Sequence, residues 1–361
     1  MPDWMLYGAT GYTGALVAEE AVQRGHRPLL AGRSAEKLRP LAERLGLEWV
    51  AVALDDAEGL AQAVSRVRLV YHAAGPFVQT SAAMVRACLK AGAHYLDITG
   101  EIPVYQQVFG YDEAARERGI ALIPGVGFDV IPSDCLLKYV ADQLPDADQL
   151  IVALDALGTS ERMTGRISAG TANSMLELLA QMGIAARRDG NLTTLPFGYG
   201  ARRFTFTTGQ KAAMPIPWGD LEIGWRTTGI PNITTFLTFP PSAIELFRVT
   251  GPLLRGLLQS SGLRGFLRGQ ISRMLSGPDE GHRQTGRSAL YAQVRNPQEE
   301  TRQAWLETAE GYQFTALAAP LVVERVLDGN LRGAITPALA LGADFVLSIP
   351  GTRRLDSLPT D

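Results

Sequence analysis

Three glycines near the N-terminus have the spacing of a dinucleotide-binding turn. They lie in the segment GATGYTG, between a short apolar run and a segment of helical period. In such a turn the first glycine permits the tight bend, the second lets backbone approach a pyrophosphate, and the third lets the helix pack on the strand. The helix N-terminus also favours phosphate. A Gly-rich turn without a ligand is the alternative. We expect these residues to bind a dinucleotide: Gly8, Thr10, Gly11, Tyr12, Thr13 and Gly14.

The end of the second predicted strand indicates which dinucleotide is bound. Sites for NAD usually carry Asp or Glu there, to hold the ribose 2′-hydroxyl. This chain instead has Arg33 and Ser34, with Lys37 one turn later. Arg33 can pair with a 2′-phosphate, and Ser34 can donate a hydrogen bond. The pattern favours NADP, with NADPH as its reduced form, although a solvated helix cap uses the same residue types. Asp55, after the third strand, either caps a helix or accepts a hydrogen bond from the adenine amino group.

The fourth predicted strand runs into a segment of small residues. Small side chains let the backbone pass close to a ribose, and a proline fixes the loop that leads away. His72, just before this segment, either packs in the core or acts as an acid. The segment is added to the expected cofactor site: Ala73, Ala74, Gly75, Pro76 and Phe77.

Four side chains at or just after the fifth and sixth predicted strands are candidates for proton transfer. They are Tyr95, Asp97, Glu101 and Asp129. A carboxylate inside a parallel strand is costly unless it is paired. Each of the four could instead hold backbone in place. The sequence does not choose between these roles.

Strands and helices must alternate to position these residues. Apolar runs that end in Gly or a small polar residue give way to segments of helical period, which predicts parallel strands joined by right-handed crossovers. The fold class is therefore α/β, a doubly wound parallel Rossmann sheet, with ligands beyond the carboxyl ends of the strands. The predicted strands are 5–8, 28–31, 49–54, 69–73, 94–98 and 120–124, and the predicted helices are 12–24, 35–45, 56–67, 81–91 and 103–117.

The remainder of the chain predicts a second, α+β domain. Its strand-like segments are separated by Gly/Pro turns rather than by regular helices. Residues 170–186 predict a helix whose N-terminus either meets a ligand or is merely capped. We expect a Rossmann domain at 1–131, a substrate and dimerisation domain at 132–311, and a return of 312–352 to the first domain. The predicted strands are 150–157, 203–207, 221–227, 233–239, 288–295 and 302–310.

Scarce residue types exclude several kinds of chemistry. The two cysteines and four histidines have no zinc-ligand spacing, so we expect no metal. None of the ten tyrosines is followed by Lys four residues later, which argues against the short-chain dehydrogenase mechanism. A net charge of −3 gives no reason to expect nucleic-acid binding. With no signal peptide and no long apolar run, we expect a cytoplasmic protein.

Several motifs together resemble one family. GATGYTG, AGR, AGPF, AGAHYLDITGE and GFDVIPSD follow one another as in the saccharopine dehydrogenase-like oxidoreductases. The chain is most similar to the branch that includes trans-acting enoyl reductases, and the segment Ser168-Ala169-Gly170-Thr171 also looks like that branch. The resemblance implies an NADP-binding Rossmann domain, a second α+β domain that supplies the substrate site, and nicotinamide chemistry.

The expected activity is hydride transfer from NADPH to a conjugated C=C in a lipid-like enoyl or enone substrate, or to an imine. One alternative is a saccharopine-type amino-acid dehydrogenase, which needs an arginine clamp for substrate carboxylates. Another is a non-catalytic NADP sensor that gates a partner. The clamp candidates are Arg162, Arg166, Arg202, Arg203 and Arg226.

Residues 242–276 form a basic amphipathic stretch, with five Arg against one Glu. Such a stretch can pack within the fold or in a homodimer, which we expect for this chain. It can also line a substrate channel, or meet a membrane surface or an acidic carrier protein.

Overall fold

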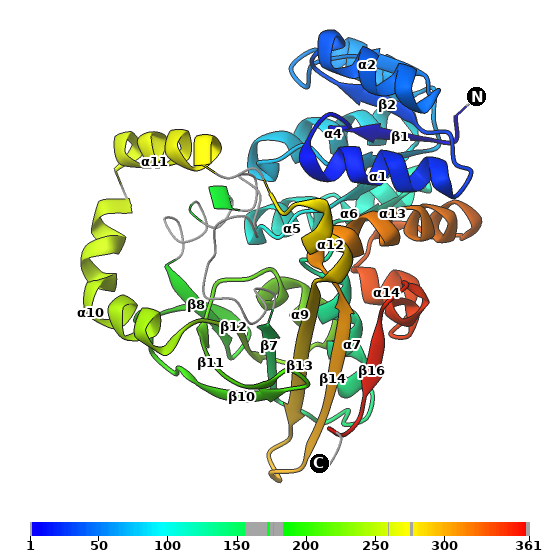
Figure 1. The fold of residues 1–361 in the computed structure, drawn as a ribbon. Coiled ribbons are helices and arrows are strands. Elements are labelled where there is room, and N and C mark those ends of the chain that lie inside the picture. Colours follow the sequence, from blue (N-terminus) through cyan, green and yellow to red (C-terminus); the bar gives the residue numbers. More distant parts are fainter. Residues whose placement is uncertain are drawn as a thin grey trace. The chain divides into compact units, whose positions relative to one another are not determined.

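The computed structural model describes residues 2–155, 172–173, 176, 183–258, 260–274 and 277–358. The chain forms two compact units (Figure 1). The first unit comprises Met1–Ile131 and Tyr312–Gly342, and the second comprises Pro132–Gly311 and Ala343–Asp361.

The first unit alternates strands with helices along most of its length. Its strands are β1 (Trp4–Tyr7), β2 (Leu29–Gly32), β3 (Trp49–Ala51), β4 (Leu69–His72), β5 (His94–Asp97), β6 (Ala121–Ile123) and β15 (Gly333–Ala334). Its helices are α1 (Tyr12–Gln23), α2 (Ala35–Leu45), α3 (Ala57–Val64), α4 (Phe77–Ala91), α5 (Ile102–Phe109), α6 (Asp112–Arg118), α13 (Gly311–Asp328) and α14 (Pro337–Leu341).

These strands make one parallel sheet in the order β15-β6-β5-β4-β1-β2-β3. The chain reverses direction across the sheet between β1 and β4, so their carboxyl ends flank the point where such sheets bind ligands. Strands β1, β2 and β4 are buried at every residue, as expected for strands covered on both faces. The predicted doubly wound sheet is confirmed.

Local signals explain where the helices of the first unit end. Helices α2 and α4 stop at Gly46 and Gly92, which adopt the left-handed conformation at φ +63° and +76°. Residues 103–117, predicted as one helix, form two helices, α5 and α6, with Gly110 between them. Helix α4 begins at Phe77, four residues before the predicted start.

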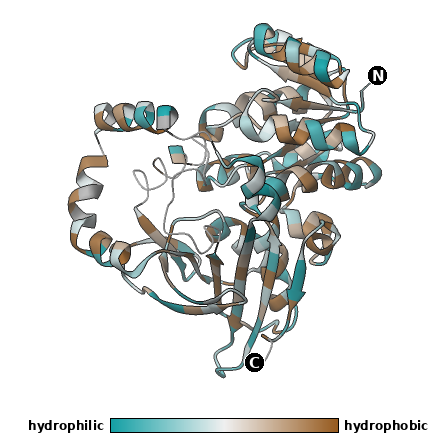
Figure 2. Cartoon of the chain, viewed as in Figure 1, coloured by the Kyte–Doolittle hydropathy of each residue, from teal (hydrophilic) through white to brown (hydrophobic). Residues whose placement is uncertain are grey.

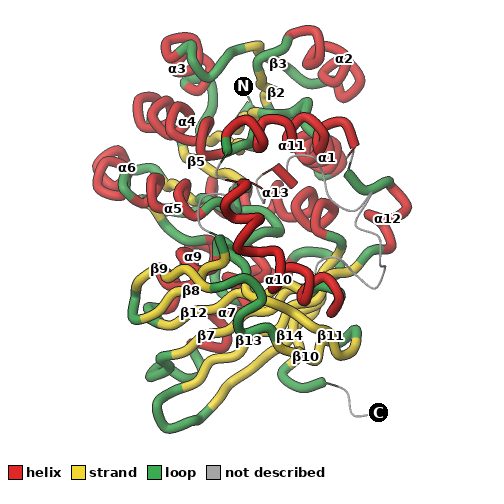
Figure 3. Tube along the Cα trace, turned by 90° about the vertical axis from the view of Figure 1, so that its left-hand side faces the viewer, coloured by secondary structure: helices red, strands yellow, loops and turns green. Residues whose placement is uncertain are grey.

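The second unit contains a nine-stranded mixed sheet. The main path is β10-β11-β12-β7-β13-β14-β16, and β8 and β9 lie off it. Strands β12, β7 and β13 lie side by side (Figure 3). Strands β7 and β12 pair in parallel, while β13 pairs antiparallel with both β7 and β14. The strands are β7 (Gln149–Asp155), β8 (Ile184–Arg188), β9 (Asn191–Leu195), β10 (Arg202–Phe206), β11 (Gly209–Pro215), β12 (Asn232–Thr238), β13 (Arg287–Arg295), β14 (Thr301–Ala309) and β16 (Arg353–Leu355).

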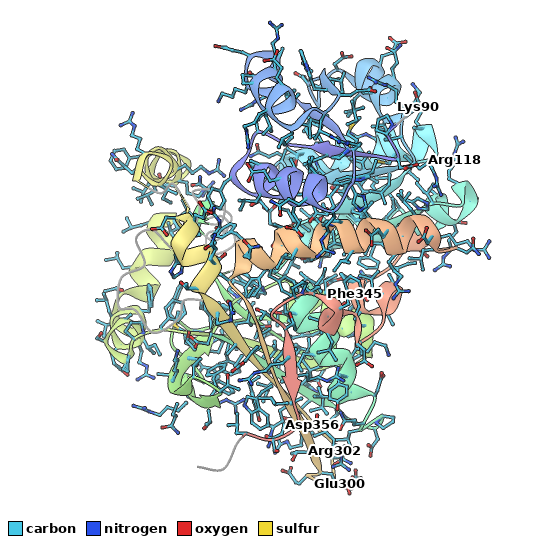
Figure 4. All side chains as sticks on the ribbon, turned by 45° about the vertical axis from the view of Figure 1, so that its right-hand side comes forward. Lys90, Arg118, Glu300, Arg302, Phe345 and Asp356 are labelled. Atoms are coloured by element: carbon cyan, nitrogen blue, oxygen red, sulfur yellow. The ribbon has the colours of Figure 1, made fainter. Side chains whose placement is uncertain are left out.

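Helices of the second unit follow several of these strands. They are α7 (Ile131–Ala141), α9 (Asp220–Thr228), α10 (Pro241–Leu258), α11 (Ser261–Met274), α12 (Glu280–Thr285) and a 3₁₀ helix at Phe345–Ser348. Figure 4 shows Glu300 and Arg302 at the tip of the long β13–β14 hairpin. The predicted second α+β unit is confirmed.

Three expectations for the chain beyond residue 150 are wrong. Residues 221–227 form helix α9 instead of a strand; acidic residues in its first turn and Gly229 at its end, at φ +73°, are helix signals. The predicted helix 170–186 cannot extend to its end, because Ile184–Arg188 is strand β8, paired with β9; most of its earlier part lies outside the described residues. Residues 343–352 belong to the second unit, where β16 pairs with β14.

Candidate functional site

Gly8 shapes the turn after β1. Its φ of +90° is a conformation that favours glycine. A β-carbon here would lie 2.8 Å from backbone atoms of Ala73 and Ala74, which follow β4. The Gly8 amide donates to the Ala31 carbonyl at 2.8 Å, at the end of β2. This glycine therefore lets three segments of the expected cofactor site come together.

The next two glycines bring helix α1 against the same turn. A β-carbon at Gly14 would lie 2.2 Å from the Gly8 carbonyl oxygen, so helix and turn are in close contact. Gly11 is the N-cap of α1 and supplies no side-chain cap. Thr10 and Gly11 are exposed. An exposed, glycine-built helix N-terminus after the first strand fits a pyrophosphate.

Tyr12 and Thr13 complete the turn and are partly exposed. The Tyr12 ring meets the ring of Tyr312 edge to face, with centroids 4.9 Å apart. Tyr312 lies in the first turn of α13, where the chain re-enters the first unit. The first turn of α1 therefore contacts a residue that is distant in the sequence. The sequence offered no local signal for this neighbour.

Arg33 and Asp55 lie near the same buried hydroxyl. The Tyr7 hydroxyl donates to the Val52 carbonyl at 3.0 Å. Burial raises the pKa of Tyr7, the positive charge of Arg33 lowers it, and the Asp55 carboxylate raises it. Both charged residues are exposed and belong to the ends of neighbouring strands. The structure thus places the Arg33 guanidinium and the Asp55 carboxylate near the carboxyl ends of strands β1, β2 and β3. This is the region expected to hold the adenosine half of the cofactor.

Ser34 is the N-cap of α2, because its hydroxyl accepts the amide of Lys37 at 3.4 Å. Lys37 itself is exposed. The cap of α3 is Asp56, whose carboxylate accepts the Gly59 amide at 2.9 Å. Asp55 is therefore not the capping residue, which removes one of its two expected roles.

Glu101 stabilises the N-terminus of α4. Its carboxylate oxygens accept the amides of Phe77 at 3.2 Å and Val78 at 2.8 Å. Pro76 precedes this helix after a cis bond from Gly75 and offers no side-chain cap. Glu101 is buried, and a carboxylate is favourable at a helix N-terminus. One proton-transfer candidate thus acts as a helix cap that holds the small-residue loop.

His72 is a neutral core residue. It is fully buried, and its Nε2 lies 3.0 Å from the Thr80 hydroxyl, which donates to the Ala74 carbonyl at 2.7 Å. Burial lowers the pKa of His72 to about 3. The rings of Tyr7 and Phe77 lie beside it, each with its centroid 5.5 Å away. Of its two expected roles, the geometry supports packing and not acid catalysis.

Tyr95 and Asp97 form a buried hydrogen-bonded pair. The Tyr95 hydroxyl donates to Asp97 Oδ2 at 2.6 Å, while Oδ1 accepts the amides of Thr99 and Gly125 at 2.9 Å each. Both side chains are fully buried. Burial raises the pKa of Asp97 to about 6 against the opposing effect of these hydrogen bonds, and raises that of Tyr95 well above its usual value. The pair ties the end of β5 to the turn after β6.

Asp129 differs from the other three candidates because it is partly exposed. Desolvation by the surrounding protein and, to a smaller extent, the nearby Glu101 carboxylate raise its pKa to about 6. A β-carbon at Gly100 would lie only 3.2 Å from Asp129 Oδ2. The absence of a side chain at Gly100 therefore makes room for this carboxyl at the carboxyl ends of β5 and β6.

Helix α13 adds contacts that sequence patterns could not reveal. The Thr315 hydroxyl accepts the Phe128 amide at 3.0 Å, and the Phe314 ring meets that of Phe128 edge to face. These contacts hold the loop that carries Asp129. Tyr105, also missed, donates its hydroxyl to the Thr99 carbonyl.

The arginine clamp receives no support from the described residues. Arg226 bonds to Glu222 at 2.9 Å, and the Arg202 guanidinium lies over the rings of Phe204 and Phe236. Arg203 is exposed on β10. Arg162 and Arg166 lie outside the described residues, as does the segment Ser168-Ala169-Gly170-Thr171.

The described residues contain neither a cluster of metal ligands nor a helix that could span a membrane. Within them, no three His, Cys, Asp or Glu side chains are grouped so that they could hold a metal ion. In the same part of the chain, every helix is too short or too polar to cross a membrane.

The comparison with known families agrees with this geometry. Residues 4–123 match the family described as the saccharopine dehydrogenase NADP-binding domain. This region is similar to that family's domain. The match covers the glycine turn, the Arg33 segment, the small-residue loop and Glu101, and it confirms the resemblance seen in the motifs. The ligand named in that family's description, NADP, thus concerns residues 4–123.

Curated relatives match over the same part of the chain. A trans-acting enoyl reductase of Mycobacterium tuberculosis is 37% identical over 140 residues, which are 37% of this chain and 34% of the relative. A trans-acting enoyl reductase of Mycobacterium ulcerans is 35% identical over 144 residues, 38% of this chain and 34% of the relative. The aligned part thus spans about a third of these relatives.

A solved structure extends the likeness of fold to both units. The apo saccharopine dehydrogenase (L-Glu forming) of Saccharomyces cerevisiae superposes with a TM-score of 0.61, covering 98% of this chain and 100% of that chain. The sequence identity is 11%, so the comparison shows a shared fold.

Proposed function

We propose that the protein is an NADPH-dependent reductase that acts on a conjugated C=C of a lipid-like enoyl or enone substrate. The single observation that carries the cofactor half is the end of β2, where Arg33 follows the strand and no carboxylate is present to repel a 2′-phosphate. The family match and the glycine turn support it. The names of the relatives support the choice of an enoyl substrate.

The residues present fit NADP along the whole carboxyl edge of β1, β2 and β4. Gly8, Gly11 and Gly14 leave room for a pyrophosphate at the N-terminus of α1, and Arg33 can pair with the 2′-phosphate. Ala73 and Ala74 lie in close contact with Gly8, and their small side chains leave space for the ribose beside the backbone. Bound NADPH supplies the hydride, which is the chemistry that the chain's own side chains lack.

Reduction of a conjugated C=C also needs an acid. After hydride adds to the β-carbon, negative charge develops on the carbonyl oxygen and the α-carbon must receive a proton. Of the four candidates, Tyr95 and Asp97 bond each other in the core and Glu101 caps α4. We therefore assign proton donation to Asp129, whose raised pKa of about 6 and partial exposure suit an acid near neutral pH.

The test measures NADPH oxidation at 340 nm with enoyl thioesters and enones, and with imine-forming mixtures of amino acids and aldehydes as the competing class. We expect turnover with the enoyl thioesters and enones. The Asp129→Asn variant should bind NADPH normally, but its turnover should be slower by about 100-fold or more. The matched control is Asp142→Asn, an exposed carboxyl on the surface, which should leave turnover unchanged.

Two outcomes would contradict the proposal. Turnover with imines alone would favour an amino-acid type of dehydrogenase. Tight NADPH binding without turnover, combined with partner binding that follows the NADP/NADPH ratio, would favour a sensor. A normal rate in Asp129→Asn would remove Asp129 as the acid while leaving the cofactor assignment intact.

A further inference from the structure

The loop between β4 and α4 is held by a threonine of the helix that follows it. Thr80 lies in the first turn of α4, and its hydroxyl donates to the Ala74 carbonyl at 2.7 Å. The same hydroxyl lies 3.3 Å from the Pro76 carbonyl, so the bond to Ala74 is the shorter of the two. A threonine bond to the carbonyl four residues earlier is common in helices, whereas Ala74 lies outside α4. Thr80 therefore fixes a peptide group of the loop.

His72 determines the direction of that hydroxyl. Its Nε2 lies 3.0 Å from Thr80 Oγ1. The hydroxyl has one proton and gives it to the Ala74 carbonyl, so His72 Nε2 must be the donor in its bond to Oγ1. Burial lowers the pKa of His72 to about 3, so the imidazole is neutral and has no second proton for Nδ1. The hydrogen bonds therefore run in one direction, from His72 to Thr80 and from Thr80 to Ala74.

Packing alone does not explain a histidine at this position. Brown, apolar residues recur throughout the strands and helices of the first unit (Figure 2). His72 is fully buried there beside the rings of Tyr7 and Phe77, and its Nδ1 has no hydrogen-bond partner within the described part of the chain. A buried nitrogen without a partner lowers stability, and an apolar side chain would avoid that loss. The bond from Nε2 to Thr80 is what the histidine adds.

The bond from Thr80 also sets the direction of the next backbone amide. The peptide bond between Ala74 and Gly75 is trans, unlike the bond between Gly75 and Pro76. In a planar trans peptide the carbonyl and the N–H point in opposite directions. Because the Ala74 carbonyl points toward Thr80, the N–H of Gly75 points away from it. Gly75 is exposed, so this donor is accessible to a ligand.

The position of β4 in the sheet indicates which part of a dinucleotide this donor can reach. Strands β2 and β4 flank β1 on its two sides. Arg33, after β2, is proposed to hold the 2′-phosphate of the adenosine half, and α1, after β1, the pyrophosphate. A dinucleotide that lies across this edge of the sheet has its other half on the side of β4. The Gly75 amide is therefore placed for the nicotinamide half.

We propose that Thr80 and His72 are positioning residues that present the Gly75 N–H to an oxygen of the nicotinamide half of NADPH. Neither side chain needs to touch the cofactor, because both act through the backbone of the loop. This inference rests on the NADPH binding proposed above and is independent of the substrate.

The experiment is isothermal titration of the full chain with NADPH and with adenosine 2′,5′-bisphosphate, which carries the 2′-phosphate but has no nicotinamide half. Thr80→Val keeps the branched shape without the hydroxyl, and it should weaken NADPH binding about fivefold or more while leaving the bisphosphate affinity unchanged. Thr80→Ser keeps the hydroxyl and should bind NADPH within about twofold of the unmodified protein. His72→Phe keeps a ring without the donor and should weaken NADPH binding about threefold.

The matched control is Thr250→Val on α10. The Thr250 hydroxyl donates to the Leu246 carbonyl at 2.8 Å, so this change removes a comparable hydrogen bond in the second unit. Its NADPH affinity should equal that of the unmodified protein. Unchanged circular dichroism and bisphosphate affinity will show that the variants fold. Should Thr80→Val not fold, Thr80→Ala carries the same expectation.

The inference is overturned if Thr80→Val binds NADPH like the control, if its bisphosphate affinity falls by the same factor, or if Thr80→Ser binds as weakly as Thr80→Val. Unchanged NADPH binding by His72→Phe would overturn the role of His72. If the unmodified chain does not bind NADPH, the proposed function fails and this inference fails with it. Tight NADPH binding by both the unmodified chain and Thr80→Val would overturn this inference alone.

Discussion

Single residues in the first unit divide into those that hold backbone and those to which the proposed function gives a role in catalysis or cofactor binding. Asp97 accepts three hydrogen bonds in the core, whereas Asp129 is partly exposed, yet burial raises the pKa of both to about 6. The same rise in pKa thus accompanies a structural role for Asp97 and the proposed catalytic role of Asp129. Exposure distinguishes them, and each role predicts a different response to substitution.

Asp97 should make stability depend on pH between about 4 and 6. Its pKa is near 3.8 when unfolded and about 6 when folded, so the folded state keeps its proton longer and the free energy of unfolding falls as pH rises through this window. Asp97→Asn should remove this contribution, of a few kcal/mol. Urea unfolding at several pH values measures it, with Asp142→Asn as the exposed control. Parallel pH curves for Asp97→Asn and the unmodified protein would show that Asp97 does not titrate as described.

Arg33 should recognise the 2′-phosphate. Removing a charge-assisted hydrogen bond to phosphate should weaken NADPH binding about tenfold or more, while NADH, which has no 2′-phosphate, should bind Arg33→Ala as before. Fluorescence titration with both cofactors measures this. Lys90→Ala, an exposed cation at the end of α4, is the control (Figure 4). Equal losses for NADPH and NADH would mean that Arg33 only supports the fold.

At the scale of elements, the first unit relies on helix N-termini that face the same sheet edge. Gly11 leaves the start of α1 without a side-chain cap, while Glu101 supplies two carboxylate oxygens to the start of α4. In the proposed function, α1 therefore binds the pyrophosphate, whereas α4 is supported from within the unit by Glu101. Glu101 is then a positioning residue for the loop at Ala73–Pro76.

Substituting Glu101 separates support from catalysis. Glu101→Ala leaves two backbone amides without their acceptor in a buried site and should lower the free energy of unfolding by about 2 kcal/mol. Glu101→Gln keeps one acceptor oxygen, so its free energy of unfolding should fall by only about 1 kcal/mol. Its turnover should stay within tenfold of that of the unmodified protein. Chemical denaturation and steady-state rates measure both, and Glu58→Ala is the exposed control. A loss of turnover beyond 100-fold at unchanged stability would instead make Glu101 an acid.

At the scale of the whole molecule, the two units differ in how much the sequence predicts. In the first unit, strands β1–β6 and the helices between them carry local signals, such as Gly46 and Gly92 at helix ends, so their order and direction follow from the chain itself. In the second unit β7 pairs with β12 and β13, both distant in sequence, and no local pattern specifies these partners. The composition of residues 221–227 is compatible with a strand, whereas Gly229 and the acidic first turn of α9 favour a helix.

The candidate site shows the same limit. Sequence spacing identified the glycine turn, the Arg33 segment and the four proton-transfer candidates, because each lies at a strand end. It could not assign their partners: Glu101 caps a helix that begins at Phe77, and Thr315 holds the loop of Asp129 from the far end of the chain. Contacts between distant segments decide which carboxyl is structural.

The central claim is that the first unit binds NADP(H) through recognition of the 2′-phosphate. Isothermal titration of the full chain with NADPH and with NADH, in the same buffer, tests it most directly. NADPH should bind at least tenfold more tightly, since the two ligands differ only in the 2′-phosphate that Arg33 is proposed to pair with. Equal affinities, or tighter binding of NADH, would contradict it.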